Sequence, residues 1–456
     1  MTRYLSTALV LLLLGPVAVR SIQNSGEEGF TLSVLTTGLE YPWEIAWGPD
    51  GYLWVTERTA KRVTRVNSID GSRHVAVTIP EAFQSVAQDG VLGLALHPRL
   101  SQGTGEDYVY VAYTYQEESD SSLKVQRFSY DQGRRLLVSP VNVITGLPAH
   151  DDHLGGRLVI GPDEKLYLTI GDQGSNWLQN FCNSNLAQDL PSASDVDAHD
   201  WTSYQGKVLR LNLDGSIPSD NPSLGGVRSH IFSYGHRNPQ GLAFGLDGLL
   251  YASEHGPSTD DELNLIESGR NYGWPQVAGY QDDQSYVYFN WSASRPASCR
   301  ELAFSTGEVP GSVPHEMESA WSHPDFQPPI QTLFTVPSGY DFRARGGATI
   351  APSSLGIYAA REEGIPGWAD SLLVPGMIKG RMYRQKLSPD GRSAVGEPIE
   401  LFRTANRYRD VAMNPDGLTI YVATDNAGRT TGRTGEMTQE LENPGAIIQF
   451  RYDHQQ

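Results

Sequence analysis

WGPDGYLWVTE, at residues 47–57, contains the pattern that decides the fold: a turn built on Pro-Asp-Gly, then a short strand of aromatic and β-branched residues. An Asp-Gly pair suits such a turn because glycine adopts a positive φ at no steric cost. The pattern recurs in IGPDEKLYLTIGD (160–172), FGLDGLLYASE (244–254) and NPDGLTIYVATD (414–425), with a looser copy in DYVYVAYTY (107–115). The chain is therefore built from repeated β units.

A second strand follows each of these units at a variable distance, as in KVQRFSYDQG and KVLRLNLDG. Each pair fits two neighbouring strands of one small antiparallel sheet. A sheet unit that repeats from end to end predicts a β-propeller, and units of roughly 40–75 residues over about 430 residues allow six to eight blades. A β-sandwich is the structural alternative, but it does not predict such a repeat.

The two ends of the chain predict how the ring closes. AIIQFRYD (446–453) matches the second strand of the repeat, and GFTLSVLTTGL (29–39) is suited to pair with it in one blade. Closure by both ends removes exposed sheet edges. The longest irregular stretches, at 174–206, 278–325 and 335–352, are then expected to be functional loops. No linker divides the chain, which predicts one domain.

The N-terminal sequence MTRYLSTALVLLLLGPVAVRS has an arginine before an apolar run that is too short to span a bilayer. We therefore expect a signal peptide at 1–22, a single propeller domain at 23–456, and a periplasmic or secreted protein. Cys182 and Cys299 are the two cysteines of the chain. They either form one disulfide in an oxidising compartment or remain two separate thiols.

The formal net charge of the chain is −18 at pH 7. Nucleic acids and anionic membranes bind basic patches, so this charge argues against both as partners. Excess carboxylate is compatible with calcium sites, and solubility explains it equally well. Zinc-protease, phosphate-loop, nucleophile-elbow and dinucleotide motifs are not apparent.

The densest polar cluster is HDDH at 150–153, which leads into a predicted hairpin with Asp172 at its end. A hairpin that brings Asp172 beside His153 makes a His–Asp couple, in which the carboxylate fixes the imidazole tautomer and raises its basicity. A solvated surface loop is the alternative interpretation of these residues.

Three further stretches combine polar groups with special backbone. Arg237, before a proline turn, is either a turn cap or the electrostatic partner of a developing anion. Gly256 and Pro257 precede acidic residues, and this mixture of carbonyl and carboxylate oxygens is what calcium prefers, although an acidic loop is the plainer interpretation. The alternation in NRYRD places Arg407 and Arg409 on one face of a strand, where they suit carboxylates or are simply solvated.

Taken together, these stretches resemble the soluble quinoprotein glucose dehydrogenases, six-bladed propellers that use pyrroloquinoline quinone (PQQ) and calcium. The resemblance covers nearly the whole mature chain and is densest in QDGVLGLALHP, GRLVIGPD, IGDQG, GHRNPQGLAF, DDELNLI, NYGWPQVAGY, IAPSS and NRYRDV. It implies an all-β fold, a six-bladed β-propeller of four-stranded antiparallel sheets. It also implies a PQQ- and calcium-dependent oxidation of an aldose at C1 to the aldonolactone.

The same resemblance implies roles for individual residues. His153 matches the general base that takes the proton of the anomeric hydroxyl while hydride passes from C1 to the quinone. Asp172 then orients and polarises His153, and Arg237 hydrogen-bonds the quinone oxygen that gains negative charge. Gln88 and Asp152 match positions that touch the sugar.

Cofactor and metal positions follow in the same way. PQQ is a tricarboxylate, and its expected contacts are Arg237, Asn238, Thr349, Lys379, Arg407 and Arg409. The cofactor-bound calcium is expected at the carbonyls of Gly256 and Pro257, where it acts as a Lewis acid. The structural calcium positions of the family match Glu262, Tyr272, Ala278, Asp282 and Glu318.

The chain departs from the family pattern at the sugar and cofactor face. Ile378 stands at the place of the cofactor lysine, with Lys379 one position later, and a one-residue slip turns a side chain to the other face of a strand. Trp177 replaces a sugar-facing glutamine, and His255 replaces a glutamine beside the Gly-Pro turn. Gly347 stands where the family has a tryptophan. We therefore expect these changes to affect which sugar is bound more than they affect the affinity for PQQ.

Two other functions remain open. A calcium-dependent propeller hydrolase, such as a lactonase, is the main rival because propellers host several chemistries. Arg407 and Arg409 favour the dehydrogenase, since a lactonase holds no tricarboxylate. A sugar-binding propeller that has lost its cofactor is the third possibility. The sequence does not identify the preferred aldose or the electron acceptor, and family members include homodimers.

Overall fold

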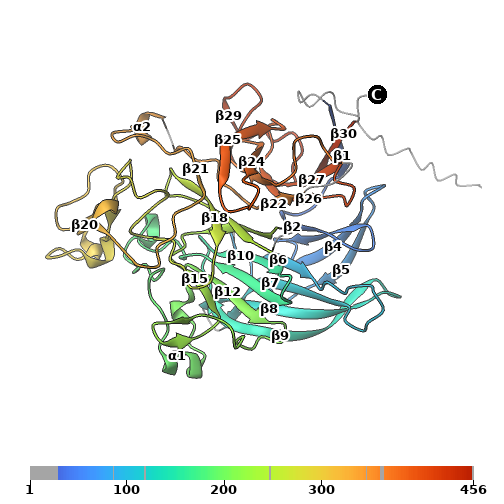
Figure 1. The fold of residues 1–456 in the computed structure, drawn as a ribbon, viewed down its shortest axis with the longest axis horizontal. Helices are drawn as coiled ribbons and strands as arrows, with labels where there is room; N and C mark the ends of the chain where they lie inside the picture. The colour runs from blue at the N-terminus through green and yellow to red at the C-terminus, as the bar shows by residue number, and fades with distance from the viewer. Residues whose placement is uncertain are drawn as a thin grey trace, which may run out of the picture.

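Six four-stranded antiparallel sheets form the body of the molecule (Figure 1). The computed structural model describes residues 29–85, 87–117, 120–245, 248–345, 347–359 and 364–453, without the side chains of 343 and 344. The predicted signal peptide at 1–22 lies outside these residues. The all-β, six-bladed propeller that the family resemblance implied is confirmed.

In each blade the first strand lies at the propeller axis, where it contacts the neighbouring blades, and the fourth strand lies at the rim. From axis to rim, the blades are β2 (Pro42–Trp47), β3 (Tyr52–Glu57), β4 (Arg62–Asn67) and β5 (Arg73–Thr78); β6 (Val91–Leu96), β7 (Tyr108–Glu117), β8 (Asp120–Asp131) and β9 (Leu136–Pro148); β10 (Gly155–Ile160), β11 (Lys165–Ile170), β12 (Lys207–Asn212) and β15 (Ile231–Tyr234); β16 (Pro239–Phe244), β17 (Leu250–Glu254), β18 (Asp261–Ile266) and β21 (Gln331–Leu333); β22 (Gly356–Tyr358), β23 (Ser371–Gly376), β24 (Arg381–Leu387) and β25 (Ala394–Leu401); and β26 (Tyr408–Met413), β27 (Thr419–Thr424), β30 (Ile447–Tyr452) and β1 (Phe30–Thr36).

The loops carry three small two-stranded sheets and a few short helices. The sheets pair β13 (Ser223–Leu224) with β14 (Val227–Arg228), β19 (Tyr288–Phe289) with β20 (His315–Glu316), and β28 (Thr430–Thr431) with β29 (Met437–Thr438). The helices are α1 (Ala193–Ala198), α2 (Phe342–Arg345) and the 3₁₀ turns Leu178–Asn180, Thr202–Tyr204, Trp291–Ala293, Cys299–Glu301 and Glu318–Ala320. Within the described residues, no helix is long and apolar enough to cross a membrane.

The sixth blade is assembled from both ends of the chain. β1 pairs with β30, from Phe30 opposite Tyr452 to Val34 opposite Ile448. β30 in turn pairs with β27, which places Phe450 opposite Ile420. The predicted closure of the ring by the two terminal strands is therefore confirmed.

The hydrophobic core is divided among the blade interfaces. Its six largest clusters each combine residues of neighbouring blades, as where Ile45 and Leu53 of the first blade meet Tyr421 and Ala423 of the sixth. Strand residues alternate between the two sheet faces, so one blade packs on both neighbours. The interfaces thus fix where the strand ends lie.

The repeated turns explain the Asp-Gly pairs in the sequence. Gly51 and Gly417 adopt φ of 75° and 73°, and each closes its turn by donating to the carbonyl three residues earlier. In the copy that lacks the glycine, Glu164 takes the same place at φ 55°. That conformation is uncommon for a residue with a side chain.

Arg157 of β10 is a buried charge among the first strands of the blades. Its Nη1 pairs with Glu44 of β2 (2.6 Å to Oε2) and Asp410 of β26 (3.3 Å to Oδ2). It also donates to the carbonyls of Gln240 (Nε, 2.8 Å) and Ser353 (Nη2, 3.0 Å). One side chain thus joins the first, third, fourth and sixth blades to the segment that leads into the fifth.

Two carboxylates share this one guanidinium, and we expect a dependence of stability on pH. Burial raises the pKa of Glu44 from 4.5 to about 8; Arg157 opposes this shift and Asp410 adds to it. A carboxyl whose pKa is raised by folding contributes stability below its unfolded pKa and loses that contribution as the pH rises through the folded value. From about pH 5 to about pH 8, denaturant unfolding should therefore show a steeper loss of stability for the native chain than for Glu44→Gln. Equal slopes would contradict this.

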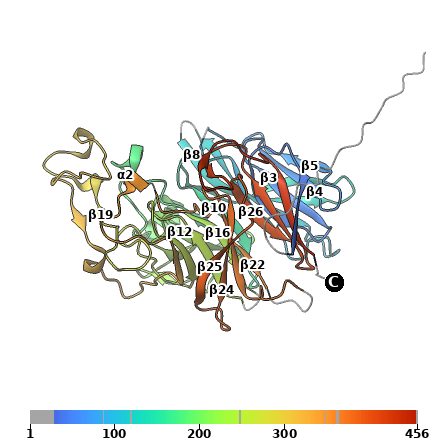
Figure 2. The same ribbon diagram turned by 90° about the horizontal axis from the view of Figure 1, so that it is seen from above.

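Two long excursions leave the propeller at one side (Figures 1 and 2). One connects β11 to β12; the other connects β18 to β21 and carries β19 and β20. Cys182 and Cys299 form a disulfide between them, 117 residues apart in the sequence. Of the two alternatives that the sequence left open for these cysteines, the structure has the disulfide.

Candidate active site

Four of the repeated strands end at a buried carboxylate: Glu57, Asp172, Glu254 and Asp425. The second strands of the blades run in equivalent directions, so these side chains lie at the same face of the propeller. Each carboxylate binds groups from a neighbouring segment, as Glu57 does with Arg62 (2.7 Å). This face carries the candidate site.

His153 lies in the loop that enters the third blade, and it is buried. Its Nδ1 is 2.7 Å from Oδ1 of Asp172, because β10 and β11 form the predicted hairpin. A carboxylate only accepts, so Nδ1 carries the proton and the lone pair is on Nε2. The backbone of His153 has φ 44°, a strained value that is concentrated at functional sites. The structure brings the expected pair together.

Asp172 is held on both carboxylate oxygens. Oδ1 also accepts from the backbone N–H of Gly174 (2.9 Å), while Oδ2 accepts from Asn185 Nδ2 (2.9 Å) and from Trp274 Nε1 (2.7 Å). Groups from both excursions therefore fix the carboxylate that orients His153. Such partners commonly set the tautomer and position of a functional histidine.

The two expected sugar contacts lie beside the histidine. Gln88 Nε2 donates to Asp152 Oδ1 at 2.6 Å, and the same oxygen accepts from the backbone N–H of His153 at 3.0 Å. His153 Nε2 is 3.9 Å from this oxygen. Hydroxyl donors and acceptors of a sugar would find partners here within reach of the imidazole.

Arg237 lies in the turn before β16, and Glu254 organises that turn. Glu254 accepts from the backbone N–H groups of Arg237 and Asn238 and lies 3.0 Å from Nδ1 of His236. Arg237 Nη1 donates to the carbonyl of His255 at 3.2 Å. Its buried Nε has no hydrogen-bond partner among the residues that the structure describes. A buried, incompletely satisfied guanidinium suits an anionic ligand.

A cavity of about 370 Å³ is lined by Arg58, Arg407, Arg409 and the buried Asp425, together with Gln88, Asn238 and His255. Asp425 pairs with Arg407 (Nε, 3.3 Å) and with Arg409 (Nε, 3.0 Å). Burial would raise the pKa of Asp425, but Arg409, Arg407 and Arg58 hold it below its ordinary value. Three guanidiniums around one carboxylate leave net positive charge, so the cavity suits a ligand with several carboxylates.

The Gly256-Pro257 turn follows β17 and is braced by Asp261. A Cβ on Gly256 would lie 1.8 Å from the carbonyl oxygen of Thr259, so only glycine fits. Asp261 accepts from the backbone N–H of Gly256 (3.0 Å) and from Thr349 Oγ1 (2.6 Å). Burial raises its pKa to about 6. Thr349 thus lies against the turn expected to hold calcium.

The expected structural calcium residues place buried carboxylates around the loop that begins at Ala278. Glu318 accepts from the backbone N–H of Ala278 (3.0 Å), and Glu262 accepts from that of Gly279 (2.7 Å). Burial raises the pKa of Glu318 to about 7 and that of Glu262 well above its ordinary value. Asp260 Oδ2 is buried without a hydrogen-bond partner. This uncompensated negative charge fits a cation.

The Asp282 side chain makes another contact, because it accepts from the backbone N–H of Gln284 at 2.9 Å. At Tyr272 the expected ligand is the backbone carbonyl, and the ring stacks on His236 at 4.6 Å. No group of three His, Cys, Asp or Glu side chains in the described part of the chain is arranged to hold a metal. A calcium site here would depend on backbone carbonyls as well.

Lys379 is placed apart from the arginines. Its Nζ lies 5.7 Å from the ring centroid of Phe334, and Met377 rather than Lys379 lines the arginine cavity. Ile378 is half-buried. Among the expected cofactor contacts, Asn238, Arg407 and Arg409 line this cavity, and Arg237 contacts the carbonyl of His255, which also lines it. Lys379 lies outside.

Sequence reasoning missed three residues of this site. Asp425 ends a copy of the repeated strand, as Asp172 does, and this shared position is the signal that could have found it. Arg58 directly follows the strand-end carboxylate of the first copy, but nothing in the sequence pairs it with the sixth blade. Trp274 reaches Asp172 across 102 positions of sequence, for which a single sequence holds no signal.

The chain is similar to known proteins in sequence and in structure. The family model described as Glucose / Sorbosone dehydrogenase matches residues 39–297 and 341–432. "Quinoprotein glucose dehydrogenase B" of Acinetobacter calcoaceticus is 42% identical over 452 residues, which are 96% of this chain and 94% of that protein. "Aldose sugar dehydrogenase YliI" of Escherichia coli is 30% identical over 257 residues, 54% of this chain and 61% of that protein.

Among solved structures, the PQQ-bound form of an aldose sugar dehydrogenase from Streptomyces coelicolor superposes with a TM-score of 0.63. It is 27% identical in sequence, and the match covers 92% of this chain and 98% of that one. Fold and site together define a propeller of the sugar dehydrogenase class. The chain belongs to the glucose/sorbosone dehydrogenase family.

Proposed function

We propose that the protein is an exported, PQQ- and calcium-dependent aldose dehydrogenase that oxidises C1 of the sugar to the aldonolactone. The observation that carries this proposal is the His153–Asp172 couple at the same face as a cavity with three arginines. The names of the relatives support a quinone cofactor and a sugar substrate.

The chain's own groups fit PQQ, which carries three carboxylates. Arg407, Arg409 and Arg58 supply more positive charge than Asp425 neutralises, and Arg237 offers its unpaired Nε. Asn238 lines the same cavity. When bound, PQQ supplies an acceptor for the hydride that leaves C1. Thr349 and Lys379 remain predicted contacts.

His153 is proposed as the general base. Because Asp172 holds the proton on Nδ1, the lone pair of Nε2 is free to take the proton of the anomeric hydroxyl. Asp172 then stabilises the imidazolium that forms. Gln88 and Asp152 are proposed to position the sugar hydroxyls beside Nε2. Arg237 stabilises negative charge that develops on the ligand oxygen nearest to it.

Calcium is proposed at two places. At Gly256 and Pro257, backbone carbonyls would hold the ion as a Lewis acid against the cofactor. Around Glu262 and Glu318, with Asp282 and the carbonyls of Tyr272 and Ala278, the ion would have a structural role and would balance buried carboxylates. The disulfide is consistent with an oxidising compartment. The signal peptide and a homodimer remain predictions.

Reconstitution distinguishes the candidate functions. Purified protein, freed of metal, is given PQQ and Ca²⁺, and dye reduction is followed with a panel of aldoses. We expect reduction that requires both additions. Hydrolysis of aldonolactones without PQQ, with no aldose-dependent dye reduction, would identify a lactonase instead. Absence of both activities together with absence of PQQ binding would leave a binding protein.

The paired arginines give a quantitative prediction. Arg407→Gln and Arg409→Gln should each raise the Kd for PQQ by about 10- to 100-fold, because a hydrogen bond to a charged partner contributes about 1.5–3 kcal/mol. An absorbance titration of the calcium-loaded protein measures this. Arg403→Gln is the control, because Arg403 is exposed, does not line the cavity and pairs with Glu400 at 3.2 Å. An equal loss in the control variant would rule out a specific role for the pair.

A further inference from the structure

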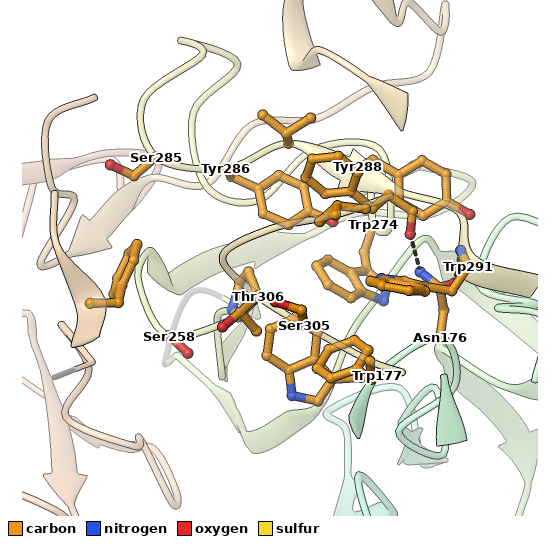
Figure 3. A pocket seen from close by; sticks show the side chains of 16 residues that line it. Asn176, Trp177, Ser258, Trp274, Ser285, Tyr286, Tyr288, Trp291, Ser305 and Thr306 are labelled. Atoms are coloured by element: carbon orange, nitrogen blue, oxygen red, sulfur yellow. Dashed lines mark hydrogen bonds between the residues drawn. The ribbon is translucent and has the colours of Figure 1, made fainter. Parts of the chain in front are cut away.

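A second cavity, of about 190 Å³, is lined in part by Trp274 (Figure 3). Its walls are aromatic and include Trp177, Tyr286, Tyr288 and Trp291. Figure 3 shows Tyr286 and Tyr288 above Trp274, and Trp177 below it. Aromatic walls interspersed with polar groups are typical of sites for small organic ligands.

None of the described side chains that line this cavity is charged, and some of their polar groups are already engaged in hydrogen bonds within the protein. Asn176 already donates to the carbonyl of Phe289 (2.7 Å) and accepts from the backbone N–H of Trp291 (2.8 Å). Ser285 donates to the carbonyl of Val336 at 2.8 Å. A hydroxyl-rich ligand would find no charged partner among the described side chains, and each hydroxyl that loses water without gaining a hydrogen bond costs free energy.

The walls are fixed before any ligand arrives. Trp177 contacts Phe304 edge-on at 5.3 Å, and Phe304 contacts Trp291 at 5.2 Å. The disulfide between Cys182 and Cys299 joins the two excursions that carry these rings. A preformed aromatic slot favours a planar ring, which stacks without ordering the protein further.

One indole separates this cavity from the candidate site. Trp274 donates through Nε1 to Asp172 at 2.7 Å, and the guanidinium carbon of Arg237 lies 5.3 Å from the indole ring centroid. Pro257, beside the proposed calcium position, also lines the cavity. A ligand in the cavity would therefore lie one side chain away from the proposed cofactor.

We propose that this cavity binds a small aromatic quinone that serves as the electron acceptor; the inference rests on the proposed function. An aromatic group attached to C1 of the sugar is not the occupant of this cavity, because a sugar that is oxidised at C1 must have a free hydroxyl there. The turnover, however, needs an oxidant. The C–H and O–H bonds at C1 break and the lactone C=O forms; the two electrons and two protons pass by way of the bound cofactor to the acceptor, whose two carbonyls become hydroxyls.

Menadione binding to the cofactor-free protein, followed by quenching of tryptophan fluorescence, tests the site without any activity. Trp177→Ala removes a wall, and Ser305→Phe fills the cavity; each should raise the Kd for menadione about tenfold or more, the order expected for loss of an aromatic contact. Trp321→Ala, in the same excursion but outside the cavity, should leave the Kd unchanged. Thermal melting checks that each variant is folded. An unchanged Kd in both cavity variants overturns the site.

The acceptor role is tested with the reconstituted enzyme. Ser305→Phe should raise the KM for menadione about tenfold and leave the KM for ferricyanide, a charged acceptor that does not fit an aromatic slot, unchanged. A higher Kd with an unchanged KM for menadione overturns the acceptor role. If neither acceptor is reduced with any aldose in the native chain, the proposed function itself fails, whereas the binding titration still reports on the cavity.

Discussion

His153→Ala should reduce aldose-dependent turnover by about 10²–10⁴-fold, the usual contribution of a general base. Nδ1 of His153 is fixed on Asp172 at 2.7 Å, so the alanine variant removes a preoriented acceptor for the hydroxyl proton rather than a loosely placed one. The binding of PQQ should change little, because the arginines that would hold its carboxylates lie on other segments. Turnover and an absorbance titration of PQQ measure the two effects separately.

His150→Ala is the matched control for this prediction. His150 lies in the same loop, but it is more exposed and pairs with Asp151 at 2.6 Å instead of with Asp172. Its loss should leave turnover within about twofold of the native value. If His153→Ala abolishes PQQ binding, or if both variants lose turnover equally, the role assigned to His153 is wrong.

Arg157→Met should destabilise the propeller by about 3–5 kcal/mol, because breaking a buried ion pair from one side leaves uncompensated charge. Glu44 and Asp410 would both lose their partner, and the carbonyls of Gln240 and Ser353 would lose a donor. The contacts join strands of four blades and the entry to a fifth, so the loss should affect the whole ring. Denaturant unfolding measures it.

Arg99→Met provides the comparison for Arg157. Arg99 also pairs with two carboxylates, Glu106 and Glu164, but at the surface. Exposed ion pairs contribute little because water solvates both partners. The loss of stability should therefore be much smaller than for Arg157→Met. Similar losses of stability in the two variants would show that the buried contacts of Arg157 have no special role.

The fold was predictable because its unit repeats. The Pro-Asp-Gly turns and the strands after them recur at 47–57, 160–172, 244–254 and 414–425, and the terminal strands match the missing partners of the last blade. The number of blades did not follow from the spacing, because loops of unequal length separate the units. It came from the family resemblance, which the sheet topology confirms.

From the residue pattern alone, the candidate site was predictable only where its partners are close in sequence, whereas Gln88, Asn238 and Asp152 came from the family resemblance. His153 and Asp172 flank one hairpin, so strand pairing alone brings them together. Asp425 and Arg58, in contrast, meet only because the ring closes between the first and sixth blades. Trp274 reaches Asp172 from an excursion whose path over the propeller is set by tertiary packing. Periodicity carries no information about such contacts.

An anaerobic titration tests directly whether PQQ bound to this protein accepts the electrons of an aldose. The protein is loaded with PQQ and Ca²⁺, excess cofactor is removed, and an aldose that supports dye reduction is added in the absence of any other acceptor. We expect the absorbance of the bound quinone to change to that of its reduced form and one equivalent of aldonolactone to appear per bound PQQ. Unchanged absorbance with no lactone, in protein that demonstrably holds PQQ, would contradict the proposed PQQ-dependent oxidation of an aldose.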